Sequence, residues 1–284
     1  MKRILLFSSL CFLLLSAHSQ ITSFTSIEEL AKNKKIDVEL KGLGGYQGDV
    51  VQINITNLTS EELHIWLESG RRLDNLNNGQ QDILVVKSQK FNLNAKKNTT
   101  ITAYGFCCQA HNGAPQADQE FSLGYMETDN LLWLAQYLND HPVLTTDVMQ
   151  HAIWVFSDGN NIGSMMLSNE EAVVDLKREM CKKLGIDVPW YEIYYEKDTT
   201  AVFSNVHYKL KGPIQYSLPN RGWFSMVIRN PSRQMVYRFT NTAFVEGGVY
   251  NYDVDVSIKD WPKGKYNIEI YLDDILKKQI SFTL

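Results

Sequence analysis

The chain has few cysteines and prolines, and it has no cluster of basic residues. Among 284 residues there are 4 Cys and 7 Pro, and 28 Lys and Arg stand against 32 Asp and Glu, for a net charge of −4. This acidity and the lack of a basic cluster argue against a nucleic-acid partner. No Gly-x-Ser-x-Gly, His-Glu-x-x-His or phosphate-loop motif is present. The motifs therefore predict no catalytic residue and no cofactor.

The histidines lack the spacing of metal ligands. His64, His111, His141 and His151 fall within one predicted domain, but no two of them are four residues apart and none accompanies a Cys-x-x-Cys pair. Surface or hydrogen-bonded histidines are the expectation, and no metal site is predicted.

Long apolar runs are also scarce, and the one present lies at the N-terminus. Residues 1–3 are basic at two positions, residues 4–16 are almost wholly apolar, and residues 17–19 offer small side chains where a signal peptidase cleaves. The run is too short for a mature membrane anchor, and no later segment is apolar enough to span a membrane. We expect residues 1–19 to be a signal peptide. The mature chain, with a net charge of about −6, is then exported to the periplasm, the cell surface or the medium.

Three cysteines would remain after cleavage, namely Cys107, Cys108 and Cys181. An odd number in an exported protein cannot pair completely. Neighbouring residues on a strand point to opposite faces, so Cys107 and Cys108 should have different surroundings. Two arrangements stay open. One is a disulfide to Cys181 with a single buried thiol left over, and the other is three free buried thiols.

The distribution of hydrophobic residues predicts a mainly β fold with a helical insert. Tyr, Phe, Trp, Val and Ile are abundant, and short β-like runs fill residues 36–105. Apolar residues then recur at helical spacing over residues 130–138, 148–156 and 170–184. Strand patterns return after Pro189 and continue to the end of the chain.

These patterns divide the chain into four segments. A signal peptide, residues 1–19, precedes a β-rich domain with a helical insert at 20–162. A helical linker at 163–189 and an immunoglobulin-like β-sandwich at 190–284 follow.

The C-terminal segment contains a recognisable hairpin sequence. Residues 261–268, Trp-Pro-Lys-Gly-Lys-Tyr-Asn-Ile, resemble the penultimate hairpin of immunoglobulin-like modules of the flagellar-hook-capping type. Residues 216–219 and 224–228 are similar to the earlier strands of that module. The resemblance covers about residues 200–284 and implies a fold, not an activity.

Two short motifs carry the functional hypothesis. Phe106-Cys107-Cys108 is followed, after a helical stretch, by Gln150-His-Ala-Ile-Trp154. This arrangement, over about residues 36–160, resembles the thioester domains of bacterial surface adhesins. The resemblance implies that Cys107 is the nucleophile and Gln150 the acyl partner, with Cys108 as the alternative thiol if the strand register shifts by one. Met149 stands where that family usually has threonine.

A Cys–Gln thioester requires a site that excludes water, because water hydrolyses the bond. Ile153 and Trp154 would supply its apolar wall. By the resemblance, a lysine amine of a partner attacks the acyl carbon and leaves an amide and a free thiol. Such a protein reacts once and is not an enzyme.

The resulting prediction is a secreted or cell-surface adhesion protein that attaches to an unidentified surface protein or glycan. One alternative is a two-domain protein that binds protein or glycan noncovalently, in which Gln150 only cross-links a loop. The other alternative is a secreted hydrolase whose catalytic residues the sequence does not reveal.

Overall fold

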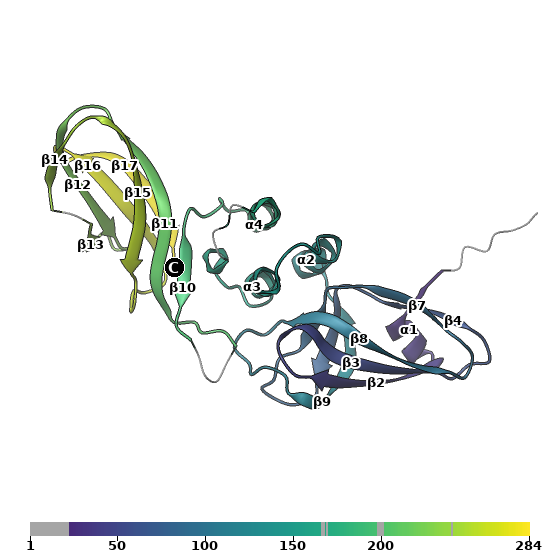
Figure 1. The fold of residues 1–284 in the computed structure, drawn as a ribbon. Helices are drawn as coiled ribbons and strands as arrows, with labels where there is room; N and C mark the ends of the chain where they lie inside the picture. Colours follow the sequence, from purple (N-terminus) through teal and green to yellow (C-terminus); the bar gives the residue numbers. More distant parts are fainter. Residues whose placement is uncertain (1–22, 166–167, 169, 198–201, 240) are drawn as a thin grey trace, which may run out of the picture.

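A computed structural model describes residues 23–165, 168, 170–197, 202–239 and 241–284. The predicted signal peptide, residues 1–19, lies outside the described residues. Along the chain a β-barrel is followed by a group of helices and then by a β-sandwich. The helices lie between the two β-structured parts (Figure 1).

Six antiparallel strands close the barrel in the order β2-β3-β8-β6-β5-β9. Their bounds are β2 Ile36–Leu43, β3 Gln47–Asn57, β5 Arg71–Asn75, β6 Ile83–Val85, β8 Asn98–Cys107 and β9 Ala117–Met126. Strand β3 shows the alternation of buried and less buried residues that a barrel wall requires, with Val51, Ile53 and Ile55 facing inward.

A short helix and a small sheet complete the barrel core. The helix is α1, Ile27–Lys32, and the sheet consists of β1 Thr25–Ser26, β4 Leu63–Leu67 and β7 Gln89–Leu93. Ile27, Ile65 and Leu67 from these elements share one hydrophobic cluster with barrel residues. Arg71 is buried beside them and donates to Glu68 at 2.7 Å and to the Gly124 carbonyl at 3.0 Å. These partners satisfy the charge that burial would otherwise leave uncompensated.

The helical segment follows the sequence prediction closely. It contains α2 Asp129–Asp140, α3 Thr146–Ser157, the 3₁₀ turn η1 Ile162–Ser164 and α4 Glu171–Leu184. Helix α2 ends two residues before Pro142, as expected for a residue that cannot continue a helix. Helix α4 ends at Gly185, whose φ of 67° places it in the left-handed region that glycine tolerates.

The three long helices bury their apolar faces in one core that the barrel shares. Leu134 of α2, Ile153 of α3 and Leu176 of α4 belong to one hydrophobic cluster with Leu84 and Phe106 of the barrel. Residues 163–189, predicted as a linker, therefore contain a helix that packs into the same core as α2 and α3.

The C-terminal part is a sandwich of two sheets. One sheet has the order β10-β11-β15, and the other has the order β13-β12-β16-β17 with β14 paired to β12. Their bounds are β10 Glu192–Tyr195, β11 His207–Leu218, β12 Gly222–Arg229, β13 Met235–Arg238, β14 Ala243–Val245, β15 Gly248–Ser257, β16 Lys265–Leu272 and β17 Ile275–Thr283. Val256 from the first sheet and Met226 and Tyr266 from the second are fully buried in their common core.

The predicted fold class, mainly β with a smaller helical part, is confirmed. One strand of the barrel, β9, lies beyond residues 36–105, over which β-like runs were predicted. In the part of the chain that the structure describes, no helix has the length and apolar character needed to cross a membrane.

A substitution at Gly105 would test the close packing of the barrel wall. A Cβ at this position in β8 would lie 2.6 Å from Ile83 Cγ2 and 2.6 Å from the Leu84 carbonyl oxygen. The second neighbour is backbone and cannot rotate away, so we expect Gly105→Ala to lower the free energy of unfolding by about 1–3 kcal/mol. Urea denaturation should detect this loss. Asn98→Ala, at the exposed start of the same strand, should change stability by no more than about 0.5 kcal/mol. Equal stability of the two variants would contradict the close approach of β6 to β8.

Candidate functional site

The structure brings Gln150 and Cys107 together. Gln150 lies in the second turn of α3, and its amide nitrogen donates to the backbone carbonyl of Cys107 at 2.7 Å. The amide carbon is about 1.3 Å from that nitrogen, so it lies within about 4 Å of the same carbonyl oxygen. The carboxamide of Gln150 therefore rests on the peptide unit that joins Cys107 to Cys108.

This contact is shielded from water. Gln150 is 1% exposed, Cys107 is 0% exposed and Cys108 is 3% exposed. Burial raises the pKa of the Cys107 thiol well above its ordinary value. Burial also raises the pKa of Cys108, although the nearby Arg72 guanidinium acts in the opposite direction. Both groups are thus held as neutral thiols, because a thiolate is poorly solvated in this environment.

The two cysteines face different cores, as the sequence predicted. Cys107 belongs to the barrel cluster, and Cys108 belongs to the cluster shared with the helices. The Cys108 thiol donates to the Asp82 carbonyl at 3.3 Å. Cys107, Cys108 and Cys181 are all free and buried. The alternative of a disulfide to Cys181 is therefore wrong, and the arrangement with three buried thiols is the one observed.

Backbone hydrogen bonds fix the two-cysteine segment from several sides. The Cys107 amide donates to the Tyr46 carbonyl at 2.9 Å, and the Cys108 amide donates to the Asp82 carbonyl at 3.1 Å. Farther along, the Ala110 amide donates to the Asp158 carboxylate, at the end of α3, at 2.8 Å. The end of β8 is thereby held against β3, against residue 82 and against α3.

A partly buried ion network supports the Asp82 contact. Arg72 donates to Asp82 at 2.5 Å and to Glu127 at 3.0 Å. The Asp82 carboxylate also accepts from the Gln109 side chain at 2.8 Å, and Gln109 in turn accepts from the Asp82 amide at 3.0 Å. Sequence reasoning missed all these residues, because nothing in the local pattern indicates that they meet across the barrel.

The two residues predicted to form an apolar wall have different positions. Ile153 packs into the helical core. Trp154 instead clusters with Ala110 and Phe203, and its ring lies 5.4 Å from the Phe203 ring. Trp154 and Gln150 are four residues apart and so lie on the same face of α3.

This face of α3 borders a cavity of about 520 Å³ between α3, the start of β3 and strand β10. Gln150, His151 and Trp154 line one side of it, and Tyr195 and Phe203 line the other. Within the described residues, five polar side chains of the cavity wall each have a buried atom without a hydrogen-bond partner. The atoms are Gln47 Oε1, Gln150 Oε1, His151 Nδ1, Trp154 Nε1 and Ser164 Oγ.

So many open hydrogen-bonding groups around one space are unusual. Native proteins satisfy the large majority of buried polar atoms, and exceptions point to a function or to a bound group. The site thus combines a buried carboxamide, hydrogen-bonded to the backbone of a segment with two buried thiols, and a polar-lined cavity that borders the carboxamide.

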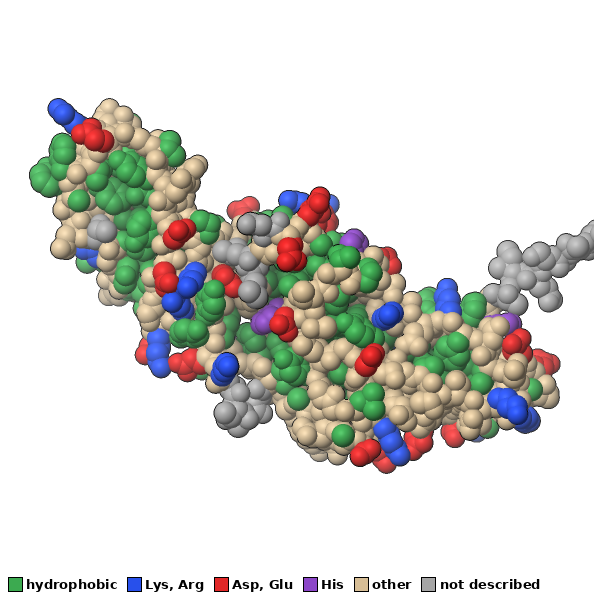
Figure 2. Space-filling model, viewed as in Figure 1, with side chains coloured by type: hydrophobic (Ala, Val, Ile, Leu, Met, Phe, Trp, Pro, Cys, Tyr) green, Lys and Arg blue, Asp and Glu red, His purple; other side chains and the backbone are tan. Residues whose placement is uncertain are grey.

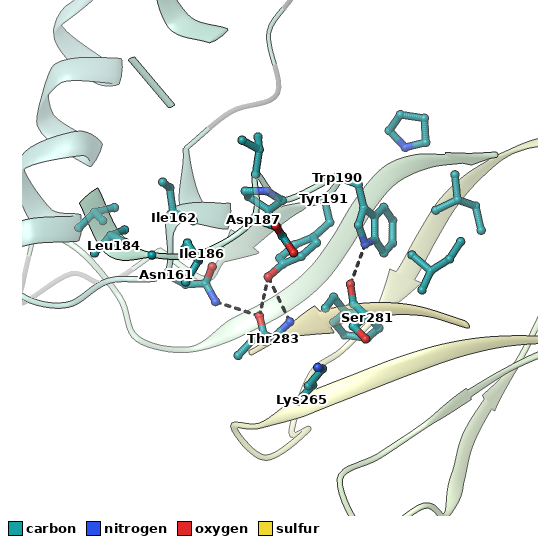
Figure 3. A pocket seen from close by; sticks show the side chains of 18 of the residues that line it. Asn161, Ile162, Leu184, Ile186, Asp187, Trp190, Tyr191, Lys265, Ser281 and Thr283 are labelled. Carbon is teal, nitrogen blue, oxygen red and sulfur yellow. Dashed lines mark hydrogen bonds between the residues drawn. The ribbon is translucent and has the colours of Figure 1, made fainter. Parts of the chain in front are cut away.

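A larger cavity of about 990 Å³ lies between the helical segment and the sandwich, and neither Cys107 nor Cys108 lines it (Figure 3). Asn161 of the helical segment donates to the Thr283 carbonyl at 2.9 Å. Within the sandwich, Tyr191 donates to the same carbonyl at 3.2 Å and Trp190 donates to the Ser281 carbonyl at 2.8 Å. The Asn161 bond thus connects the helical segment to the last strand of the sandwich.

Comparison with known proteins places the chain in no family: no protein-family model matches it, and no curated protein matches it. Among the residues that the structure describes, no group of three or more His, Cys, Asp or Glu side chains is arranged to hold a metal ion.

Arg72 provides a test of how the site is supported. Arg72→Leu leaves Asp82 and Glu127 partly buried without their cation, so we expect the free energy of unfolding to fall by about 2–4 kcal/mol. Urea denaturation measures this loss. Arg178→Leu is the matched control, because Arg178 pairs with Asp175 on the exposed surface of α4. That exposed pair should contribute no more than about 1 kcal/mol. A loss of the same size in both variants would show that the network around Asp82 has no special role.

Proposed function

We propose that this chain is an exported surface-binding protein that attaches covalently to its target through a thioester between the Cys107 sulfur and the Gln150 side-chain carbon. The observation that carries the proposal is the 2.7 Å hydrogen bond from the Gln150 amide to the Cys107 carbonyl. It joins the two motifs that resemble adhesin thioester domains, although 42 residues lie between Cys107 and Gln150. Their burial supplies the dryness that a thioester needs.

The chemistry balances without a cofactor. The Cys107 sulfur attacks the Gln150 amide carbon and forms the C–S bond. The amide C–N bond breaks, and the nitrogen leaves as ammonia with the thiol proton. A primary amine of a target later attacks the same carbon. The C–S bond then breaks, an amide links the two proteins, and Cys107 regains its proton. Each molecule reacts once, so the proposal describes a binding protein and not an enzyme.

Cys107 is favoured over Cys108 as the thiol. The Cys108 sulfur already donates to the Asp82 carbonyl. Within the described residues, the Cys107 sulfur has no hydrogen bond to break. Cys108 remains the alternative, and the variants described below separate the two.

A second candidate function is noncovalent binding of a protein or a glycan. Hydrophobic side chains gather over the C-terminal sandwich (Figure 2). Trp223 and Phe244 of this sandwich are more than half exposed and contact each other edge to face, with ring centroids 5.5 Å apart. Exposed aromatic pairs are common at interaction surfaces. Binding through this surface would not involve the cysteines. The noncovalent candidate therefore predicts the full sequence mass, whereas the covalent candidate predicts a mass deficit.

The covalent proposal predicts a mass deficit. The purified mature protein should weigh about 17 Da less than its sequence, because ammonia is lost when the thioester forms. Incubation with methylamine should turn this deficit into a gain of about 14 Da over the sequence mass. Intact-mass spectrometry measures both. A full sequence mass and no methylamine adduct would exclude the thioester and leave noncovalent binding as the function.

Single substitutions assign the thiol. We expect Cys107→Ala and Gln150→Ala to have no deficit and no adduct, because each lacks one of the two bonded groups. Cys108→Ala is the matched control, since it removes a neighbouring buried thiol and should keep both signals. Loss of the deficit in Cys108→Ala with its retention in Cys107→Ala would reassign the bond to Cys108.

A count of thiols gives an independent check. In the denatured mature protein, a thiol reagent should find Cys108 and Cys181 but not Cys107, which is acylated. After methylamine treatment, the count should rise by one, because aminolysis releases the Cys107 thiol. An unchanged count would contradict the proposed bond.

A further inference from the structure

We propose that the larger cavity, between the helical segment and the sandwich, binds a small amphiphilic anion, namely an apolar chain that ends in a carboxylate. The inference goes beyond the proposed thioester and does not depend on it, because neither Cys107 nor Gln150 lines this cavity. Three features of the cavity support it: its size and place, its uncovered apolar side chains, and its charge.

The first argument is the size and place of the cavity. Its volume of about 990 Å³ is at the upper end of the range for small-molecule sites, which often lie where two structural parts of a chain meet. The walls come from the end of α3 and the loop after it, from the segment after α4, and from strands β11, β16 and β17. A bound molecule would therefore contact both the helical segment and the sandwich.

The second argument is a row of apolar side chains that the fold leaves uncovered. Leu184, Ile186 and Val188, at the end of α4 and just beyond it, are 38%, 49% and 51% exposed, and all three line the cavity. Ile280 and the half-buried ring of Trp190 add apolar surface from the sandwich. Figure 3 shows Leu184 and Ile186 on the helical side of the cavity and Trp190 beside the sandwich strands. An apolar chain that covered this row would be stabilised by about 25 cal/mol for each Å² removed from water.

The third argument is charge. The charged side chains that line the cavity are two lysines, Lys265 of β16 and Lys278 of β17, and one carboxylate, Asp187. In the described part of the chain, none of the three forms an ion pair. The chain as a whole is acidic, so this excess of positive charge is a local feature. It favours an anionic ligand and disfavours a cationic one.

The two lysines are placed to bind a carboxylate. Lys278 donates to the carbonyl of Gln215, another lining residue, at 2.7 Å. An ammonium group has three donors, so two of them stay available to a ligand. Lys265 lies opposite Thr283 of β17 in the sheet, and Figure 3 shows it on the sandwich side of the cavity. The cations thus come from the sandwich wall and the apolar row comes from the helical wall, so a molecule that contacts both needs an apolar part and an anionic part.

The test measures binding of dodecanoate to the full mature chain by titration calorimetry, at concentrations at which the ligand is monomeric. Dodecyltrimethylammonium has the same chain with the opposite charge, and acetate has the same carboxylate without the chain. We expect dodecanoate to bind, and we expect each of the other two to bind at least about tenfold more weakly. The first lacks attraction to the lysines, and the second buries no apolar surface. No binding of dodecanoate, or equal affinity for the two twelve-carbon amphiphiles, would overturn the proposal.

Substitutions in the wall test the position of the ligand. The double variant Lys265→Gln/Lys278→Gln should bind dodecanoate about tenfold more weakly, and Asp187→Asn should bind it about twofold more tightly. Lys182→Gln is the matched control, because Lys182 is 77% exposed on α4 and does not line the cavity, and it should bind as the wild type does. These side chains are exposed, so all the variants should fold. Wild-type affinity in the double variant would place the ligand elsewhere and overturn the site.

Val188→Ser tests the apolar wall separately. It removes half-exposed apolar surface without changing charge, and we expect it to weaken dodecanoate binding about fivefold while acetate binding stays as in the wild type. Equal dodecanoate affinity in Val188→Ser and the wild type would contradict the role of the apolar row.

Hydrogen exchange locates the bound molecule directly. With dodecanoate bound, backbone amides of residues 184–191 and 278–284 should exchange more slowly. Slower exchange confined to other segments would overturn the site. Vesicles of phosphatidylcholine and phosphatidylglycerol in equal parts test a bilayer as the source of the same chemistry. We expect the protein not to sediment with them, and binding to vesicles without binding of free dodecanoate would overturn the proposal. None of these outcomes affects the thioester, which the mass measurement tests independently.

Discussion

The hydrogen bond from the Gln150 amide to the Cys107 carbonyl is the contact that joins the helical layer to the end of a barrel strand. It is short, buried and formed between neutral groups, so it needs no counterion and is weakened little by salt. Around it, the backbone bonds of Cys107, Cys108 and Ala110 fix the same segment to Tyr46, Asp82 and Asp158. The fold thus holds the carboxamide against the backbone of the two-cysteine segment, before any covalent bond is considered.

Two neighbouring regions of the molecule differ in whether their polar side chains have hydrogen-bond partners. On one side of the cysteines, the side chains of Arg72, Asp82 and Gln109 satisfy one another in a compact network. On the other side, the cavity wall includes buried polar atoms without partners in the described part of the chain. The first region stabilises the fold around the cysteines, because loss of one member would leave its partners in the network unpaired. The second region is a candidate for a functional role, because native proteins pair the large majority of their buried polar atoms.

The distant parts of the chain contribute to one pocket. Helix α3 supplies Gln150 and His151, the start of β3 supplies Gln47, and residues 192–197 and 202–204 supply the opposite wall. A bond from Asn161 to the Thr283 carbonyl connects the helical segment to the last strand of the sandwich. The C-terminal sandwich therefore shapes access to the buried carboxamide, in addition to displaying its own exposed aromatic residues.

Local patterns in the sequence determined much of this structure. Helical spacing and end signals located α2, α3 and α4, because capping and periodicity depend on residues close in the chain. Alternation predicted the opposite faces of Cys107 and Cys108 for the same reason. The motifs also indicated the Cys107–Gln150 pair, which the fold brings into contact.

Only the tertiary structure decided the remaining features. Strands β5 and β9 close the barrel through pairing with distant strands, and the Arg72–Asp82–Glu127 network forms across that closure. The free state of Cys181, the cavity and the buried polar atoms that lack partners among the described residues likewise depend on which segments meet in space. Such contacts join residues far apart in the chain, and their energies depend on burial and mutual geometry that a local pattern does not encode.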